Sequence, residues 1–240
     1  MSARIERVST PDGPFDLTVW LPEAGTGPGI LLIQEIFGVG DYIQAVAEDL
    51  AALGYVVAAP DLFWRLKPGY SPVHDEQGLA ESFDVASRFD PGQGVVDAAA
   101  ALEHLTTLPE VHGGLGIVGF CLGGSIGYFL AARSRVDALV SFYGSEVPGH
   151  TEVLAHISAP IQFHFGGNDP YIPRDQVARV EAAVQDIQNA EIHVEEEAGH
   201  AFHNRKAPMF YQPEPAARAW RRTEEFLARE LPVRRPGPSG

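Results

Sequence analysis

The chain has 240 residues, of which 45% are hydrophobic and 20% charged, and this is enough to bury the core of one α/β domain. Its formal net charge of −15 disfavours binding to nucleic acid or to an anionic membrane surface, because both would repel the chain at long range. The first residues lack an apolar signal segment and no apolar run is long enough to span a bilayer, so we expect a cytoplasmic protein. We expect it to be a monomer or a small homo-oligomer and to act on a small molecule.

Short apolar runs rich in β-branched and aromatic residues alternate with longer stretches of helical periodicity. This alternation is typical of βαβ units and predicts an α/β fold with a mostly parallel central sheet and helices on both faces. The expected strands are Phe15–Leu21, Gly29–Gln34, Tyr55–Ala59, Leu115–Phe120, Ala138–Tyr143, Ile161–Gly166 and Glu191–Glu195. The expected helices are one that follows Asp41 and ends before Gly54, then Glu76–Arg88, Val95–Leu108, Leu122–Arg133, Arg174–Gln188 and Pro215–Glu230.

One domain is expected over residues 1–231, since no internal repeat divides the chain. The span 62–90 is less regular than the rest and contains Pro68-Gly69-Tyr70-Ser71-Pro72, so we expect an insertion that forms a lid or a pocket wall. Residues 232–240 are rich in proline and glycine and are expected to form a flexible tail.

The candidate nucleophile is Cys121, the single cysteine of the chain, which sits where a predicted strand gives way to a predicted helix. Glycines stand two positions before it and two positions after it, in Leu115-Gly-Ile-Val-Gly-Phe-Cys-Leu-Gly-Gly-Ser125. This spacing is typical of a nucleophile elbow, a tight turn that presents one side chain above the sheet. A single cysteine allows neither an internal disulfide nor a zinc site built from cysteine pairs. The pattern therefore favours a reactive thiol over the alternative of a small buried apolar residue.

A carboxylate and a histidine follow in the order that the α/β-hydrolase fold imposes. Asp169 lies after the sixth expected strand, and His200 lies in the loop after the seventh. Like Cys121, both fall at the carboxyl ends of predicted strands, where open α/β sheets place their sites. The sequence therefore predicts an α/β-hydrolase fold with a triad of these three residues. The local alternatives are an Asx turn at Asp169 and a role for His203, three positions further on.

The chemistry assigns a role to each member of the triad. A free thiol has a pKa of about 8.5, so a neighbour must remove its proton before it attacks a carbonyl at neutral pH. His200 would accept or relay that proton and later activate water against the thioester, while Asp169 would hold the imidazole tautomer. The N–H of Leu122 opens the helix after the elbow, so we expect it to be one oxyanion donor, and the loop after Gly29–Gln34 should supply the second.

Several motifs together resemble the dienelactone hydrolase (carboxymethylenebutenolidase) family. They are Gln34-Glu-Ile-Phe-Gly38, Ala59-Pro-Asp-Leu-Phe63, Gly119-Phe-Cys-Leu-Gly-Gly124, Ser141-Phe-Tyr-Gly144, Gly167-Asn-Asp169 and Gly199-His-Ala-Phe202. The resemblance implies hydrolysis of an enol lactone or another activated carboxylic ester through a cysteine acyl-enzyme, with no metal or organic cofactor. It also implies that Ile36 gives the second oxyanion N–H and that Glu35 contacts the resting thiol, which it deprotonates once substrate binds. Phe37 and Tyr143 would line the pocket.

The chain departs from the family at the positions that bind a substrate carboxylate. Family members that act on dienelactone hold its carboxylate with two arginines, and these places fall at Leu79 and Asn204 here. A guanidinium binds a carboxylate at two points, which neither leucine nor asparagine can do. We therefore expect a less charged ester, lactone or thioester as substrate, unless Arg205 or Arg65 binds a carboxylate from a shifted position.

Other expected pocket positions also differ from the family. The serine that follows the catalytic histidine there is Ala201 here, and nearby pocket aromatics fall at Phe83 and Ala86. Phe63 and Trp64, in the irregular span, either line the pocket or close the core. Since fold and motif do not guarantee activity, the second hypothesis is a small-molecule binding or signalling protein on the same scaffold with little turnover.

Overall fold

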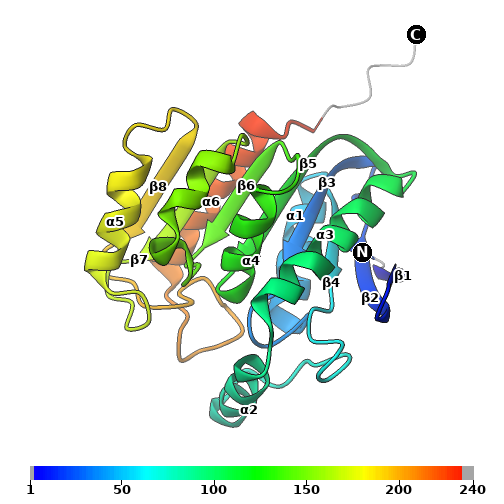
Figure 1. The fold of residues 1–240 in the computed structure, drawn as a ribbon, viewed down its shortest axis with the longest axis horizontal. Coiled ribbons are helices and arrows are strands. Elements are labelled where there is room, and N and C mark those ends of the chain that lie inside the picture. The colour runs from blue at the N-terminus through cyan, green and yellow to red at the C-terminus, as the bar shows by residue number, and fades with distance from the viewer. Residues whose placement is uncertain (1–2, 234–240) are drawn as a thin grey trace.

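The computed structural model describes residues 3–233, which form an eight-stranded sheet with helices on both faces (Figure 1). The strand order is β1-β2-β4-β3-β5-β6-β7-β8. From β4 to β8 in this order all neighbours are parallel, whereas β2 runs antiparallel to both β1 and β4. The mostly parallel sheet with helices on both faces is therefore confirmed.

The strands are β1 (Ala3–Thr10), β2 (Gly13–Trp20), β3 (Gly27–Ile33), β4 (Val56–Pro60), β5 (Val111–Phe120), β6 (Ala138–Phe142), β7 (Ile161–Gly166) and β8 (Ala190–Glu195). The helices are α1 (Asp41–Ala52), α2 (Glu76–Ser87), α3 (Pro91–Thr107), α4 (Leu122–Ala131), α5 (Arg174–Val184) and α6 (Pro213–Glu230), and two 3₁₀ turns (Val147–Gly149, Thr151–His156) follow β6. Strands β4, β6 and β7 are buried along their whole length because α3 and α4 cover one face of the sheet and α1 and α6 the other (Figure 1).

Strand β1 is missing from the sequence-based prediction. It is the edge strand of the sheet and buries only Val8, while Ile5 remains 64% exposed, so its apolar signal is weak. Pro11-Asp12-Gly13, which joins it to β2, has the residue types of a hairpin turn and could have revealed it.

Helix α3 begins four residues earlier than predicted, at Pro91. The side chain of Asp90 caps it by accepting the N–H groups of Gly92 and Gln93. An N-cap followed by proline is a helix start that depends on polar residues, so a search for apolar periodicity begins only at Val95.

The span 62–90 contains α2, which begins at an Asp75 N-cap and projects beyond the end of the sheet in Figure 1. At the other end of the chain, Val233 still packs against the core, whereas residues 234–240 of the expected tail lie outside the described residues. Within residues 3–233, none of the helices combines the length and the apolar character needed to cross a bilayer.

Candidate active site

Cys121 occupies a strained turn between β5 and α4, as the elbow pattern predicts. Its φ of 52° lies in the left-handed region, which residues with a side chain rarely adopt. The turn is possible because glycines surround it. A Cβ on Gly119 would lie 2.1 Å from the carbonyl oxygen of Gly123, and a Cβ on Gly123 would lie 2.1 Å from that of Ile33. The backbone thus sets the partly exposed thiol at the carboxyl end of the sheet.

The three predicted triad residues lie together. His200, in the loop after β8, places Nε2 3.1 Å from Cys121 Sγ and Nδ1 2.7 Å from Asp169 Oδ2. The other carboxylate oxygen of Asp169 accepts the N–H groups of Tyr171 at 2.8 Å and Ile172 at 3.2 Å. These bonds form an Asx turn. One oxygen of the carboxylate thus makes the turn while the other contacts His200, so the two interpretations of Asp169 do not exclude each other.

The electrostatics of the site favour a protonated His200. Burial alone would lower the pKa of this imidazole, but the negative charge of Cys121 and the hydrogen bond to Asp169 outweigh it and raise the pKa to about 10. His203 is different, since it is buried with Nδ1 2.7 Å from the hydroxyl of Tyr42, and burial lowers its pKa to about 3. The imidazole beside the thiol is therefore that of His200.

Two backbone amides expected to bind an oxyanion border the same cavity as the thiol. Leu122 is the first residue of α4, and Ile36 lies in the loop after β3. In the described part of the chain, no backbone carbonyl accepts the N–H of either residue. An unpaired N–H at a helix N-terminus attracts negative charge, so both amides are available to an oxygen in the cavity.

Glu35 does not bond to the resting thiol, and in this respect the structure differs from what the family resemblance implies. The hydrogen-bond partner of Cys121 Sγ is His200, while Glu35 Oε1 lies 3.6 Å from His74 Nε2. Burial raises the pKa of Glu35, and His74 acts in the opposite direction. The His74 ring stacks on Phe37, with ring centroids 4.2 Å apart. Glu35 thus borders the cavity but turns toward a residue that the sequence did not single out.

The cavity above Cys121 has a volume of about 350 Å³ and a mostly apolar lining. Helix α2 supplies one wall through Leu79, Phe83 and Ala86, so the span 62–90 does form a pocket wall. The rest of the lining is Glu35, Ile36, Phe37, Cys121, Leu122, Ser145, Tyr171, His200, Ala201 and Phe210. This set includes the predicted Phe37, Phe83 and Ala201, and it contains neither lysine nor arginine.

The arginines that were considered as substitutes lie elsewhere. Arg205 donates to Asp49 at 2.6 Å on the surface of α1, and Arg65 pairs with Asp97 and Asp12. Asn204, which was expected to line the pocket, is fully buried outside the cavity lining. Among residues 3–233, the cavity lining therefore offers a substrate carboxylate no cation other than the His200 imidazolium.

Three aromatic residues that were expected to line the pocket lie outside the cavity lining, so this part of the prediction is wrong. Phe63 packs in a small buried cluster beneath α2, and Trp64 donates to Asp97 Oδ2 at 3.0 Å. Tyr143 is buried, with its ring centroid 5.2 Å from that of His200. Phe63 and Trp64 therefore close the core, and the Tyr143 ring packs beside the His200 imidazole from outside the cavity.

Sequence reasoning missed Tyr171, Phe210 and His74. Tyr171 follows Asp169 by two residues at the end of β7, so its place in a strand-end loop could have identified it. Phe210 and His74 lie in irregular segments without a motif, and only the path of the backbone brings them to the site. Among the residues that the structure describes, no group of three or more histidine, cysteine or carboxylate side chains is arranged to hold a metal ion.

Comparisons with known proteins agree with this geometry. The model of the dienelactone hydrolase family matches residues 15–231. A carboxymethylenebutenolidase from Pseudomonas sp. is 32% identical over 223 residues, which cover 92% of this chain and 92% of that protein. Carboxymethylenebutenolidase 1 from Cupriavidus pinatubonensis is 31% identical over 233 residues, or 95% and 97% of the two chains. A solved dienelactone hydrolase-like promiscuous phosphotriesterase from metagenomic libraries has a TM-score of 0.79 at 23% identity, over 96% of this chain and 98% of that one, and supports the α/β-hydrolase fold.

Proposed function

Because the chain belongs to the dienelactone hydrolase family, we propose that it hydrolyses an uncharged carboxylic ester or lactone through an acyl-enzyme on Cys121. At the level that its relatives support, the protein is a hydrolase of lactones or esters. The finer assignment depends on one observation, the chain of contacts from Cys121 Sγ through His200 to Asp169. A pure binding protein has no use for an imidazolium held against a thiol, so the binding or signalling alternative is not favoured.

In the proposed acylation step, the negatively charged sulfur of Cys121 attacks the substrate carbonyl carbon and forms a C–S bond. The carbonyl oxygen becomes an oxyanion that accepts the N–H groups of Leu122 and Ile36. The C–O bond then breaks, and the leaving oxygen takes the proton from His200 Nε2. The raised pKa of His200 supports this role, since the imidazole still carries its proton at neutral pH.

In the proposed deacylation step, His200 is neutral and accepts a proton from the water that attacks the thioester. The second oxyanion collapses, the C–S bond breaks, and a carboxylic acid leaves. The sulfur is again a thiolate beside an imidazolium, which restores the resting pair. Asp169 stabilises that imidazolium through the hydrogen bond to Nδ1.

We also propose that Glu35 is a secondary proton acceptor in those molecules in which Cys121 is a neutral thiol instead of the thiolate paired with His200. The carboxyl group borders the cavity and is 4% exposed, and burial raises its pKa, which makes it a better proton acceptor than an exposed carboxylate. Its side chain must first turn from His74 toward Cys121. Glu35 would then affect acylation more than deacylation.

The substrate class follows from the charge of the cavity. An apolar lining without lysine or arginine, in a chain of net charge −15, favours an uncharged acyl group. A carboxylate such as that of dienelactone would lose its hydration there without gaining a guanidinium partner.

Leu79→Arg should reverse this preference. Leu79 lines the cavity from α2, so an arginine there could meet a substrate carboxylate. We expect the wild-type protein to have a higher kcat/KM on an uncharged enol ester than on dienelactone. In the variant, kcat/KM on dienelactone should rise about tenfold, which corresponds to about 1.4 kcal/mol of charge pairing. Leu79→Met is the matched control and should leave the ratio unchanged. A wild type that prefers dienelactone by a wide margin would refute the proposed substrate class.

A further inference from the structure

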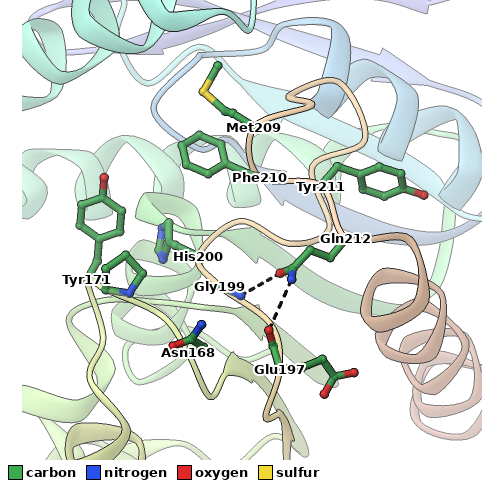
Figure 2. A pocket seen from close by; sticks show the side chains of 10 residues that line it. Asn168, Tyr171, Glu197, Gly199, His200, Met209, Phe210, Tyr211 and Gln212 are labelled. Carbon is green, nitrogen blue, oxygen red and sulfur yellow. Dashed lines mark hydrogen bonds between the residues drawn. The ribbon is translucent and has the colours of Figure 1, made fainter.

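A second hollow, of about 340 Å³, adjoins the catalytic cavity and shares Tyr171, His200 and Phe210 with it. Figure 2 shows the side chains of these residues around one end of this hollow, with Met209 next to Phe210. Tyr171 is 50% exposed and Met209 is 43% exposed, although both are large and apolar in character. Exposed apolar groups gathered beside a catalytic residue indicate a surface that a ligand covers.

The walls of this hollow are held in place. The Gln212 side chain accepts the N–H of Gly199 at 2.8 Å and donates to the carbonyl of Glu197 at 3.4 Å (Figure 2). These bonds tie the segment that carries Phe210 to the loop that carries His200. On the opposite wall, the Tyr171 ring meets His200 edge to face, with centroids 5.0 Å apart. The hollow is thus built into the same framework as the catalytic imidazole.

We propose that this hollow binds the leaving alcohol or phenol of the substrate ester, while the cavity above Cys121 binds the acyl group. The assignment rests on the proposed function. A leaving oxygen must lie next to His200 Nε2 to receive its proton, whereas the carbonyl oxygen lies at the amides of Leu122 and Ile36. The substituent on the leaving oxygen is therefore directed to the side of His200, and the hollow is the space that adjoins His200 outside the acyl cavity.

The lining also defines the chemical class of the leaving group. Tyr171, Phe210 and Met209 offer aromatic and thioether surfaces, and the hollow has no lysine or arginine in its lining. A neutral aryl or bulky alkyl alcohol fits this surface, and an anionic leaving group does not. In a lactone the leaving oxygen stays attached to the acyl chain and would leave the hollow empty, so an intermolecular ester uses the site more fully.

The test compares two esters with the same acyl group and with leaving groups of similar acidity, 1-naphthyl and hexafluoroisopropyl butyrate. Both give the same acyl-enzyme, so a difference in kcat/KM reports leaving-group binding during acylation. We expect Met209→Ala to lower the ratio of the naphthyl to the fluoroalkyl value by about five- to tenfold, because burial of most of one side chain is worth about 1 to 1.5 kcal/mol. Leu79→Ala is the control, since Leu79 borders only the acyl cavity and should change both values alike.

A second measurement keeps the proposal independent of turnover. 1-Naphthol should inhibit the wild-type enzyme competitively and inhibit Met209→Ala several-fold more weakly. An unchanged ratio of the two esters together with unchanged naphthol inhibition would overturn the subsite while leaving the hydrolase intact. Inactivity of the wild type on both esters would instead overturn the proposed function.

A separate observation concerns the buried pair of Glu35 and His74. Their side chains are only 6% and 4% exposed, and Glu35 Oε1 and His74 Nε2 face each other at 3.6 Å. Neither atom has a hydrogen-bond partner in the described residues, so their contact is a close pairing of two buried polar groups. The stack on Phe37 fixes the His74 ring, and Phe37 directly follows the oxyanion residue Ile36.

We infer that His74 is a positioning residue that holds the Glu35 carboxylate in place beside the loop of Ile36. This inference rests on the role proposed above for Glu35. The other groups that act on Glu35 are the backbone N–H of Phe37 and the His200 imidazole, which both lower its pKa. The buried hydroxyls of Tyr42 and Tyr143 also interact with this carboxylate. Burial raises the pKa of Glu35 and His74 lowers it. Loss of His74 should therefore raise this pKa further, so that Glu35 ionises only at higher pH.

His74→Phe tests this role because it keeps the aromatic stack on Phe37 and removes both ring nitrogens. We expect the acidic limb of the kcat/KM profile to move to higher pH in this variant and to move less in His74→Gln, which retains a hydrogen-bond donor. Glu35→Gln should remove the contribution of Glu35 to this limb, and adding His74→Phe to it should not move the limb further. If the pH profiles of wild type and His74→Phe coincide, or if the effects of Glu35→Gln and His74→Phe add in the double variant, His74 is a purely structural residue. Urea unfolding of each variant measures the loss of stability that a structural role would cause.

Discussion

Cys121→Ala should abolish ester hydrolysis, with kcat falling by about 10⁴-fold or more, while the protein remains folded. Removing the nucleophile of a coupled triad costs nearly the whole catalytic effect of that triad. Alanine is smaller than cysteine and adds no contact at the glycine-lined turn, so the elbow should tolerate it. The measurement is the burst and steady state of p-nitrophenyl butyrate hydrolysis, with intact-protein mass spectrometry to detect the acyl group on the wild type and its absence from the variant.

Cys121→Ser is the more demanding control. The hydroxyl occupies nearly the same place but is far less acidic than a thiol, so it cannot exist as the anion of a resting ion pair with His200. We expect activity well below that of the wild type, together with loss of iodoacetamide labelling. Turnover by the alanine variant within tenfold of wild type would show that the nucleophile lies elsewhere.

The parts of the site that follow regular strands could be predicted from the sequence. The second half of β5 is largely apolar, and β7 and β8 alternate apolar with polar residues, which are both local signals of a strand. The residues just after such strands lie at one edge of any parallel sheet. Their order along the chain then suffices to propose Cys121, Asp169 and His200. In the structure, His200 Nε2 lies 3.1 Å from Cys121 Sγ, and His200 Nδ1 lies 2.7 Å from Asp169 Oδ2. Their assignment as catalytic residues is the proposal that the variants above test.

The pocket wall was harder to predict because it depends on how irregular segments turn. Phe63 and Trp64 are adjacent aromatics in a loop, and nothing in their spacing shows that Trp64 turns to Asp97 and Phe63 packs beneath α2. Phe83 lies on α2, where helical periodicity fixes which residues share a face, and it does line the cavity. The contact of His74 with Glu35 joins two loops that are distant in sequence, and no local pattern encodes it.

The expectation of an uncharged substrate depends less on the three-dimensional structure than the shape of the pocket does. A leucine at a position where family members have an arginine carries no charge, whichever way the side chain points. The expectation of an uncharged substrate therefore needed only a comparison of one sequence position with the family. Whether Arg205 or Arg65 could compensate required coordinates, since both have carboxylate partners, Asp49 for the first and Asp97 with Asp12 for the second.

His200→Ala should separate the two halves of the reaction. Without the imidazolium, the thiol loses its ionic partner, so acylation at neutral pH should be slow. Raising the pH above about 9 should restore part of it, because an isolated thiol ionises with a pKa of about 8.5. Deacylation should not recover in the same way, because water has lost its general base, a loss of about 10² to 10⁴-fold.

The acyl-enzyme should therefore accumulate in His200→Ala at high pH, where the wild type turns over. Intact-protein mass spectrometry after mixing with p-nitrophenyl butyrate would show a stable acyl adduct on Cys121, lost in the double variant with Cys121→Ala. His112→Ala, which alters an exposed histidine on β5, should behave like the wild type. Normal turnover in His200→Ala would mean that another group activates water. The nearest histidine in sequence, His203, is already bonded to Tyr42, and burial keeps it neutral, so that outcome would point to Glu35.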